Sequence, residues 1–330
     1  MRSNSTMTGK ITLEDHFALP DTIDDSERYF TPEIWPKMKH RLVDIHETRI
    51  EEMDKHGIET MILSLNAIAV QAVWDTRRAV ELARQANDYL AEQVAKNPKR
   101  FHGFAALAMQ DPDAATRELI RCVTDLGFKG ALVNGFSQKD TEDSAIYYDL
   151  PRYEAFWATV ERLHVPFYLH PREPLPSRSQ HYEGHPWFLG SAWSFNAETS
   201  IHALRLMASG IFDRYPRLTV ILGHLGETIP YNIWRIDHRL RRTPRGIPAK
   251  KPLGEYLRHN MYLTTSGQFH TETLAAALSE VGADRILFSV DWPFEDLGHG
   301  AEWFDRARIE EADRAKIGRT NAEKLLGLAK

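Results

Sequence analysis

Acidic and histidine residues stand at the ends of four short apolar segments of this sequence. The segments cover residues 10–16, 165–170, 218–224 and 285–291. Short apolar runs of this kind are typical of buried parallel strands. A carboxylate or imidazole buried at a strand end is costly unless a cation or a hydrogen-bond partner meets it. The residues at these ends, all of types that bind metals or transfer protons, are Glu14, His16, His170, His224 and Asp291.

Four of these residues form a candidate set of metal ligands. Glu14 and His16 are two positions apart, so a strand projects both side chains to the same side. His170 and Asp291 each follow an apolar run, and a buried carboxylate without a partner is highly unfavourable. Two imidazoles and two carboxylates without a thiolate suit Zn²⁺ or Mn²⁺. We therefore expect a divalent metal with open positions for water or substrate.

Each ligand also has an ordinary structural alternative. The strand end at Glu14 could be solvated, and His170 could be a core histidine with a satisfied hydrogen bond. Asp291 could form a salt bridge with Arg235 or Arg172. The metal site is favoured because all four ligands are expected at one end of the same fold.

His224 has a carboxylate three residues further on, in the sequence Gly223-His224-Leu225-Gly226-Glu227. If a helix begins there, Glu227 can turn back to the imidazole, fix its tautomer and raise its basicity. His224 would then act as an acid, a base or a group that orients the substrate. The alternative is that Glu227 only stabilises a helix start while His224 packs in the core.

Strand and helix patterns alternate along the chain. Residues 76–96 have the spacing of an amphipathic helix, and Asp111-Pro112 is a typical helix start. Alternating strands and helices predict parallel βαβ units, and eight of them predict a single (β/α)8 barrel. Active sites of this fold lie at the carboxyl ends of the strands. The expected strands cover residues 10–16, 58–65, 101–108, 128–134, 165–170, 218–224, 260–266 and 285–291.

The barrel domain is expected to span residues 10–330 after a flexible segment at 1–9. Long loops are expected after the first strand (17–41) and after the fifth (171–195), and loops of that length are usually functional. No change in composition marks a second domain.

The composition excludes several classes of protein. The net charge of −5 gives no reason to expect a nucleic-acid partner. A single cysteine, Cys122, excludes an internal disulfide framework. No apolar run has the length of a membrane span, and the N-terminus lacks the apolar core of a signal peptide, so a cytoplasmic location is expected.

Four motifs at the strand ends resemble the amidohydrolase superfamily. They are Glu-x-His after the first strand, His-Pro after the fifth, Gly-His-x-Gly-Glu after the sixth and Ser-x-Asp-Trp-Pro after the eighth. They are similar to its metal-dependent, non-oxidative decarboxylase branch. Within that branch, residues 13–18, 61–67, 131–138 and 285–295 look most like the γ-resorcylate (2,6-dihydroxybenzoate) decarboxylases. The branch members acting on 2,3-dihydroxybenzoate lack a histidine at the position of His16.

The resemblance implies one divalent metal ion per subunit, Mn²⁺ or Zn²⁺, on Glu14, His16, His170 and Asp291. It also implies a homotetramer, a small aromatic acid as substrate and no organic cofactor. Hydrolases of the superfamily typically have His-x-His where this chain has Glu14-Asp15-His16, and this chain lacks a strand-end lysine to bridge two metals after Asn134. The sequence therefore does not match a hydrolase with two metal ions in its active site.

The expected reaction is the reversible loss of carbon dioxide from an ortho-hydroxybenzoate. Asp291 is the expected proton donor to the ring carbon, and His224 with Glu227 would bind a substrate oxygen. Other hydroxybenzoates (2,3-dihydroxybenzoate, 5-carboxyvanillate), a mononuclear lactone or amide hydrolase, and binding without turnover remain alternatives. The candidate substrate-wall residues are Phe17, Trp193, Phe195 and Arg235.

Overall fold

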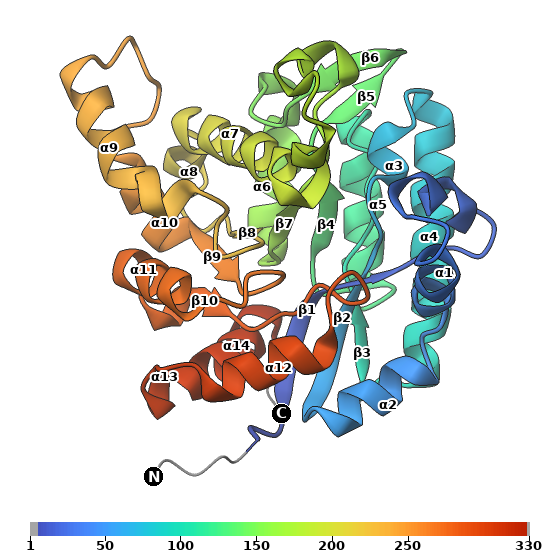
Figure 1. Cartoon of the computed structure of the whole chain (residues 1–330). Helices are drawn as coiled ribbons and strands as arrows, with labels where there is room; N and C mark the ends of the chain where they lie inside the picture. Colours follow the sequence, from blue (N-terminus) through green and yellow to red (C-terminus); the bar gives the residue numbers. More distant parts are fainter. Residues whose placement is uncertain (1–5, 329–330) are drawn as a thin grey trace.

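The computed structural model describes residues 6–328 of the chain. Parallel strands lie in the middle of the molecule, and helices surround them (Figure 1). The strands are β1 (Lys10–Phe17), β2 (Ile58–Leu65), β3 (Phe101–Gly103), β4 (Ala131–Asn134), β5 (Ser137–Lys139), β6 (Thr141–Ile146), β7 (Phe167–His170), β8 (Val220–Leu222), β9 (Met261–Thr264) and β10 (Ile286–Leu287).

The parallel strands form two hydrogen-bonded sheets instead of one continuous ladder. One sheet has the order β1-β2-β3, and the other has the order β10-β9-β8-β7-β4. Single parallel bridges join Asp15 to Trp292 and Ala105 to Ala131, where edges of the two sheets meet. Strands β5 and β6 form a separate antiparallel hairpin. The expected parallel βα architecture is therefore present.

The helices lie between the strands in the sequence, as the alternating pattern predicts. Their α-helical members are α1 (Trp35–Val43), α2 (Thr48–Lys55), α3 (Ala69–Ala72), α4 (Thr76–Lys96), α5 (Pro112–Thr124), α6 (Glu154–Leu163), α7 (Ser194–Ala208), α8 (Ile211–Arg214), α9 (Ile229–Arg242), α10 (Leu253–Asn260), α11 (Thr271–Val281), α12 (Leu297–Arg306), α13 (Glu311–Ala315) and α14 (Asn321–Leu326). Helix α9 extends away from the body at the upper left of Figure 1.

Helices α4 and α5 both begin with a capping aspartate, of which the one at Asp111 was predicted. The side chain of Asp75 accepts a hydrogen bond from the backbone nitrogen of Arg78 at the start of α4. Asp111 accepts from the nitrogens of Asp113 and Ala114 at the start of α5. Such caps satisfy backbone donors that have no partner within the helix.

The set of β1 side chains that point into the protein switches part-way along the strand. Ile11 and Leu13 pack in one apolar cluster with residues such as Tyr168 and Leu287. The pairing of β1 with β2 then shifts register between Thr12 and Asp15. A β-bulge of this kind re-aims the side chains that follow it. Glu14 and His16 therefore point inward like Leu13, although strict alternation along a strand would place them on the opposite side from Leu13.

The loops after β1 and β7 contain more helical structure than the sequence predicts. The segment after β1 forms a 3₁₀ helix, η1 (Ile23–Tyr29), and helix α1. The segment after β7 contains four short 3₁₀ helices, η3 (Pro176–Arg178), η4 (Gln180–Tyr182), η5 (Pro186–Phe188) and η6 (Gly190–Ala192). These turns lack the long apolar periodicity by which helices are recognised in a sequence.

The expected flexible segment at 1–9 lies partly outside the described residues, since residues 1–5 are not among them. Met7 and Gly9 contact the body of the protein. The ammonium group of Lys10 donates to the carbonyl of Met7 at 2.7 Å and to both carboxylate oxygens of Asp305 at 3.0 and 3.1 Å. Arg319 donates to the carbonyl of Gly9 at 2.7 Å. Across residues 6–328, no helix combines the length and apolarity that crossing a membrane requires.

Candidate active site

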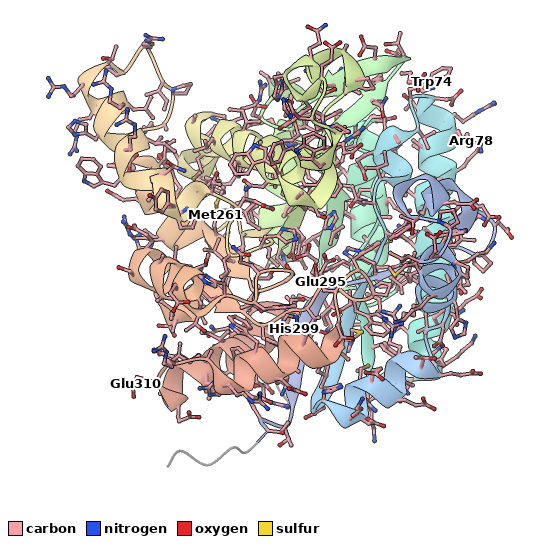
Figure 2. The ribbon with its side chains drawn as sticks, viewed as in Figure 1. Trp74, Arg78, Met261, Glu295, His299 and Glu310 are labelled. Atoms are coloured by element: carbon pink, nitrogen blue, oxygen red, sulfur yellow. The ribbon has the colours of Figure 1, made fainter. Side chains whose placement is uncertain are left out.

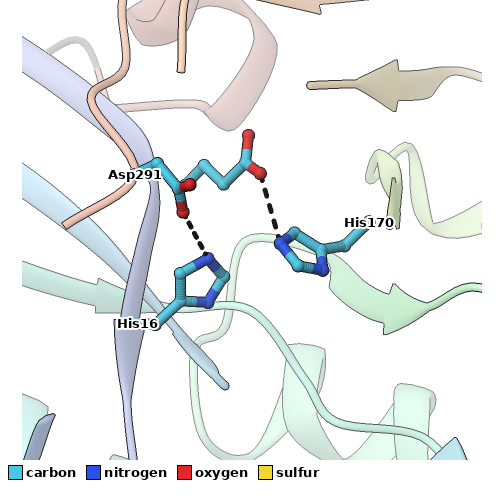
Figure 3. A group of neighbouring side chains, drawn as sticks. His16, His170 and Asp291 are labelled. Atoms are coloured by element: carbon cyan, nitrogen blue, oxygen red, sulfur yellow. Dashed lines mark ion pairs between the residues drawn. The ribbon is translucent and has the colours of Figure 1, made fainter. Parts of the chain in front are cut away.

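Four predicted ligands meet at the carboxyl ends of β1 and β7 and after β10. One donor atom from each of Glu14, His16, His170 and Asp291 lies within 4.8 Å of the others. His16 Nε2 is 3.1 Å from Asp291 Oδ1, and His170 Nε2 is 3.3 Å from Glu14 Oε1 (Figure 3). Ligands held about 2.0–2.2 Å from one divalent cation lie about 3.0–3.5 Å from their neighbours. The observed spacing fits a single cation.

Hydrogen bonds fix which nitrogen of each histidine faces this centre. The Nδ1 atom of His170 is 3.0 Å from the carbonyl of Pro171, so Nδ1 carries the proton. The Nδ1 atom of His16 is 3.2 Å from the Ser64 hydroxyl, which donates its own proton to the carbonyl of Asp15. Both Nε2 atoms are therefore free to bind a metal. Second hydrogen bonds of this kind orient metal-binding histidines in general.

Three of the four ligand atoms are buried without a hydrogen-bond partner. Within residues 6–328, Glu14 Oε1, His16 Nε2 and Asp291 Oδ1 have no such partner. Buried polar atoms are nearly always satisfied by protein, water or an ion. Oxygen and nitrogen donors of these types suit Mn²⁺ or Zn²⁺. The residues present therefore fit the expected metal.

The charges of the site follow from its burial. Burial lowers the pKa of His16 to about 4 and that of His170 to about 3, so both rings are neutral at neutral pH. Burial also acts to raise the pKa of Glu14, but His224 and the other site histidines outweigh it and lower the pKa to about 2. Burial, followed by the charge of Glu14, raises the pKa of Asp291 well above its ordinary value. Asp291 is thus the carboxyl group of the site that most readily holds a proton.

The carboxylate of Glu14 rests in a set of hydroxyl groups that the sequence analysis missed. Tyr168 and Ser266 donate to Glu14 Oε2, and Thr264 lies 3.2 Å from the same oxygen. A signal for them exists in the sequence. Tyr168 is two positions before His170 on β7, and Thr264 and Ser266 are two positions apart at the end of β9, so each points to the side that the ligands occupy.

The bulge in β1 is stabilised by a residue next to the metal ligands. The hydroxyl oxygen of Ser289 accepts from the backbone nitrogens of Leu13 and Glu14 at 3.1 and 2.7 Å. Ser289 is two positions before Asp291. One serine therefore links the strand that carries Glu14 to the strand end that carries Asp291.

His224 and Glu227 are paired as predicted. The Nδ1 atom of His224 is 2.8 Å from Glu227 Oε1, and its Nε2 atom is 3.7 Å from Glu14 Oε1. Burial acts to lower the pKa of His224, but the carboxylates of Glu227 and Glu14 outweigh it and raise the pKa to about 10. The ring is therefore a cation at neutral pH, with Nε2 as a hydrogen-bond donor facing the metal cluster.

The backbone that carries these two residues differs from the expected helix start. Helix α9 begins at Ile229, and His224, Leu225 and Glu227 precede it with φ of +52°, +54° and +58°. Asp291 also has a positive φ of +81°. L-residues seldom adopt this left-handed region, and such strain is found mainly at functional sites.

A buried arginine, Arg49, hydrogen-bonds the backbone of a candidate ligand. The sequence analysis did not single it out. Arg49 of α2 is fully buried and donates to the carbonyl of His16 at 2.7 Å. Burial lowers the pKa of Arg49 to about 10, which leaves the group charged. Asp15 lies nearby, and burial raises its pKa to about 7. Its Oδ1 accepts from the nitrogen of Trp292 at 3.3 Å.

The four expected substrate-wall residues do not join the metal cluster through any contact described within residues 6–328. The ring of Phe17 stacks on Tyr89 of α4, 5.9 Å away, because Phe17 points to the outside when its neighbour His16 points inward. Trp193 is exposed at the start of α7, and Phe195 is partly buried in that helix. Arg235 is exposed on α9.

Phe294 is an aromatic residue that does lie beside the site. Its ring is 5.4 Å from the ring of His16, and Phe30 stacks on its other side at 6.1 Å. Phe294 is 37% exposed, so its side chain reaches the surface. Glu295 and His299 follow on the same segment and the start of α12, as Figure 2 shows. Phe294 follows the Ser-x-Asp-Trp-Pro motif and lies within residues 285–295, one of the segments that carry the family resemblance, so the sequence held a signal for it.

Comparisons with known proteins show which family the chain is similar to. A family model described as amidohydrolase matches residues 16–328. The γ-resorcylate decarboxylase of Rhizobium sp. strain MTP-10005 is 59% identical over 324 residues, which are 98% of this chain and 99% of the relative. A crystal structure of a dihydroxybenzoic acid decarboxylase from Polaromonas sp. JS666 contains manganese and the inhibitor 2-nitroresorcinol. It is 58% identical, covers 98% of both chains and has a TM-score of 0.96.

A third relative is more distant. The 5-carboxyvanillate decarboxylase of Novosphingobium aromaticivorans, in complex with manganese and 4-hydroxy-3-methoxy-5-nitrobenzoic acid, is 30% identical with a TM-score of 0.90. The alignment covers 99% of this chain and 100% of that one. Together with the family model, which spans nearly the whole sequence, these similarities place the chain in the amidohydrolase family.

Proposed function

We propose that this protein is a metal-dependent decarboxylase that converts 2,6-dihydroxybenzoate to resorcinol and carbon dioxide in a reversible, non-oxidative reaction. The observation that carries the proposal is the cluster of Glu14, His16, His170 and Asp291, with ligand atoms that lack partners within residues 6–328. The relatives named γ-resorcylate decarboxylase, at 59% identity over 98% of this chain, support the choice of substrate.

The inhibitor bound by the Polaromonas relative supports the same substrate. In 2-nitroresorcinol, a nitro group stands between two hydroxyl groups. In 2,6-dihydroxybenzoate, a carboxylate of similar shape stands there instead. Both compounds present an oxygen of the central group and an adjacent phenol oxygen on the same edge of the ring.

The resident metal is proposed to be Mn²⁺, with Zn²⁺ as the alternative, held by the four clustered residues. When bound, it supplies a Lewis acid that orients the substrate and stabilises charge on its carboxylate and phenol oxygens. Manganese in two relatives supports this assignment.

Asp291 is proposed to carry the proton. It takes a proton from a substrate hydroxyl on binding and delivers it to the ring carbon that bears the carboxylate. The bond from that carbon to the carboxylate then breaks, carbon dioxide leaves, and the electron pair restores the aromatic ring. The phenolate of the product regains one proton from solvent. The position of Asp291 among the clustered residues, with Oδ1 3.1 Å from His16 Nε2, supports this role.

His224 is proposed to hold a substrate oxygen as a charged hydrogen-bond donor. Its pairing with Glu227 at 2.8 Å keeps Nδ1 occupied and leaves Nε2 for the substrate. The ring of Phe294 is proposed to cover one face of the aromatic acid, since it lies 5.4 Å from the ring of His16 and is partly exposed.

We further propose that residues 10–330 form one domain whose strands close into a (β/α)8 barrel. The bridges from Asp15 to Trp292 and from Ala105 to Ala131 support closure, because they join the two sheets at both meeting edges. Hydrogen–deuterium exchange tests closure. Backbone amides at both bridges are expected to exchange as slowly as those within the ladders.

A homotetramer is also proposed. Helix α9 exposes Tyr231 and Trp234 by 87% and 69%, and Trp187 after β7 is 62% exposed. Large exposed aromatic residues often mark contacts between proteins. Size-exclusion chromatography with light scattering measures the assembly. Replacing Tyr231 and Trp234 by serine is expected to reduce its mass, and a monomeric wild-type chain would contradict the proposal.

The decisive experiment is an anaerobic assay of the manganese-loaded protein with 2,6-dihydroxybenzoate, in which carbon dioxide and resorcinol are measured. Chelator-treated protein is the control, and 2,3-dihydroxybenzoate and 5-carboxyvanillate are compared at equal concentration. In D₂O, the resorcinol should carry one deuterium between its hydroxyl groups. Absence of carbon dioxide from 2,6-dihydroxybenzoate would overturn the proposal. Turnover of a lactone or amide without carbon dioxide would then identify a hydrolase.

A further inference from the structure

The two oxygens of the Glu14 carboxylate have very different surroundings. Oε2 accepts from the hydroxyls of Tyr168 and Ser266 and lies 3.2 Å from that of Thr264. Oε1 has no hydrogen-bond partner within residues 6–328 and faces His170 Nε2 at 3.3 Å. Every hydroxyl donor around the carboxylate is therefore on one oxygen, and the other oxygen faces the metal cluster.

The three hydroxyls are also bonded to one another. Thr264 Oγ1 is 2.8 Å from the Tyr168 hydroxyl and 2.7 Å from Ser266 Oγ. Three hydroxyl protons are available, and each has an acceptor when Tyr168 and Ser266 donate to Glu14 and Thr264 donates to a neighbour. All three side chains are fully buried. We call Tyr168, Thr264 and Ser266 the hydroxyl cradle.

The surroundings of the cradle leave the carboxylate little freedom. A side chain added at Gly223 would come within 2.8 Å of Glu14 Oε2. Ser266 Oγ also accepts from the backbone nitrogen of His224 at 3.3 Å. The cradle thus ties Glu14 to the backbone of His224.

A purely structural role would not produce this asymmetry. A buried carboxylate is stabilised best when donors are distributed over both oxygens, because each oxygen has lone pairs to satisfy. Here one oxygen has three hydroxyl neighbours, and the other has none within residues 6–328. Arranging donors on one side costs stability in the absence of a cation and holds the free oxygen in a fixed direction.

We propose that the hydroxyl cradle is a positioning device that makes Glu14 a one-oxygen metal ligand, with Oε1 aimed at the metal before the metal arrives. Tyr168, Thr264 and Ser266 act only through Glu14 and do not touch the substrate. The inference rests on the metal site of the proposed function and does not depend on which acid is the substrate.

The test measures manganese binding in the absence of substrate. Tyr168→Phe keeps the ring and removes one hydroxyl, and Thr264→Val removes another. We expect each to weaken Mn²⁺ affinity by 10–100-fold, the usual loss when a group that supports a metal ligand is removed. Electron paramagnetic resonance of free manganese gives the affinity. Thr264→Ser restores the hydroxyl and should recover affinity to within about threefold of wild type, a threshold set well inside that 10–100-fold loss.

The matched control is Tyr153→Phe. Tyr153 is equally buried, and its hydroxyl donates to the carbonyl of Met109 at 2.7 Å, outside the metal site. This control should lose thermal stability much as Tyr168→Phe does and keep wild-type manganese affinity. A crystal structure of manganese-loaded Tyr168→Phe should show Glu14 turned or bound through both oxygens.

The outcomes separate the two proposals. If the wild type binds manganese and Tyr168→Phe binds it equally well, the cradle is only structural and the inference fails. If the wild type binds neither manganese nor zinc, the metal site of the proposed function fails as well. If the variants bind manganese more weakly as expected but the wild type does not decarboxylate 2,6-dihydroxybenzoate, the role of the cradle is supported. Only the substrate assignment is then overturned.

Discussion

The two ends of β1 bury charge in opposite ways. At its first residue, the ammonium group of Lys10 is fully buried but has three oxygen partners, from Met7 and Asp305. Near its other end, Glu14 and His16 are equally buried, yet each has a polar atom without a hydrogen-bond partner within residues 6–328. The comparison distinguishes buried polar groups that stabilise the fold through their partners from buried polar groups that are available to bind a ligand. The two kinds look alike in the sequence.

The largest expected effect is at the metal end. Asp291→Asn keeps the size of the side chain and removes the proton carrier. We expect turnover of 2,6-dihydroxybenzoate to fall by about 10³-fold at saturating manganese, because a positioned acid typically contributes 10²–10⁴-fold. Steady-state assays measure turnover, and thermal unfolding should change little. An active Asn variant would rule out Asp291 as the proton donor.

The opposite result is expected at the other end of the strand. Lys10→Met leaves the mostly buried Asp305 carboxylate without its partner, and breaking a buried pair typically costs about 3–5 kcal/mol. Urea unfolding should show a loss of that size. Manganese affinity and turnover per folded molecule should stay at wild-type values. A selective loss of manganese affinity in this variant would contradict the claim that Lys10 stabilises the fold without affecting metal binding.

His202 offers a third case, because its Nδ1 atom is also without a hydrogen-bond partner within residues 6–328. Its Nε2 accepts from the nitrogen of Tyr148 at 3.2 Å, and no other metal-binding side chain of the described residues groups with it. Burial lowers its pKa to about 3. The unfolded chain gains a proton near pH 6.5 and the folded chain does not, so stability is lost as pH falls below 6.5.

The matched variant is His202→Gln, whose amide oxygen can accept the same hydrogen bond. Between pH 7 and pH 5, the wild type should lose about 2 kcal/mol more stability than this variant. Urea unfolding at both pH values measures the difference. An equal loss in both proteins, or a loss of manganese binding by His202→Gln, would contradict this account of His202.

The smallest effect is expected at Glu227. Glu227→Gln removes the carboxylate that raises the pKa of His224, so that pKa should fall from about 10 toward its ordinary value. The cationic form then disappears as pH rises above neutrality. We expect kcat/KM to fall by about tenfold at pH 8 and by less at pH 6, relative to wild type. A parallel pH profile in both proteins would exclude a role for the His224 cation.

The sequence predicts the elements that have long patterns and strong end signals. Residues 76–96 are helical as expected, and a helix begins at Asp111-Pro112 as expected, because apolar spacing and a capping aspartate are strong signals. The β2 strand at 58–65 also has its expected bounds. The segment after β1 was expected to be irregular, because 3₁₀ turns and a short helix have no pattern long enough to detect.

Some residues of the site could likewise be predicted from the sequence, and others could not. The four ligands and the His224–Glu227 pair could be found because their types are unusual at the ends of apolar strands. Arg49 could not be distinguished from an ordinary residue, since its role depends on the atom that it faces. Phe17 was expected beside the substrate, but strand alternation directs it outward. Phe294 has the neighbouring position instead.

The candidate metal ligands come from the beginning, the middle and the last part of the polypeptide. Asp15 and Trp292, which bond to each other beside the centre, are 277 positions apart in the chain. During synthesis, a chain that ends before Asp291 has the histidines and Glu14 but cannot complete the ligand set. The complete set of four candidate ligands is thus available only after synthesis has passed residue 291.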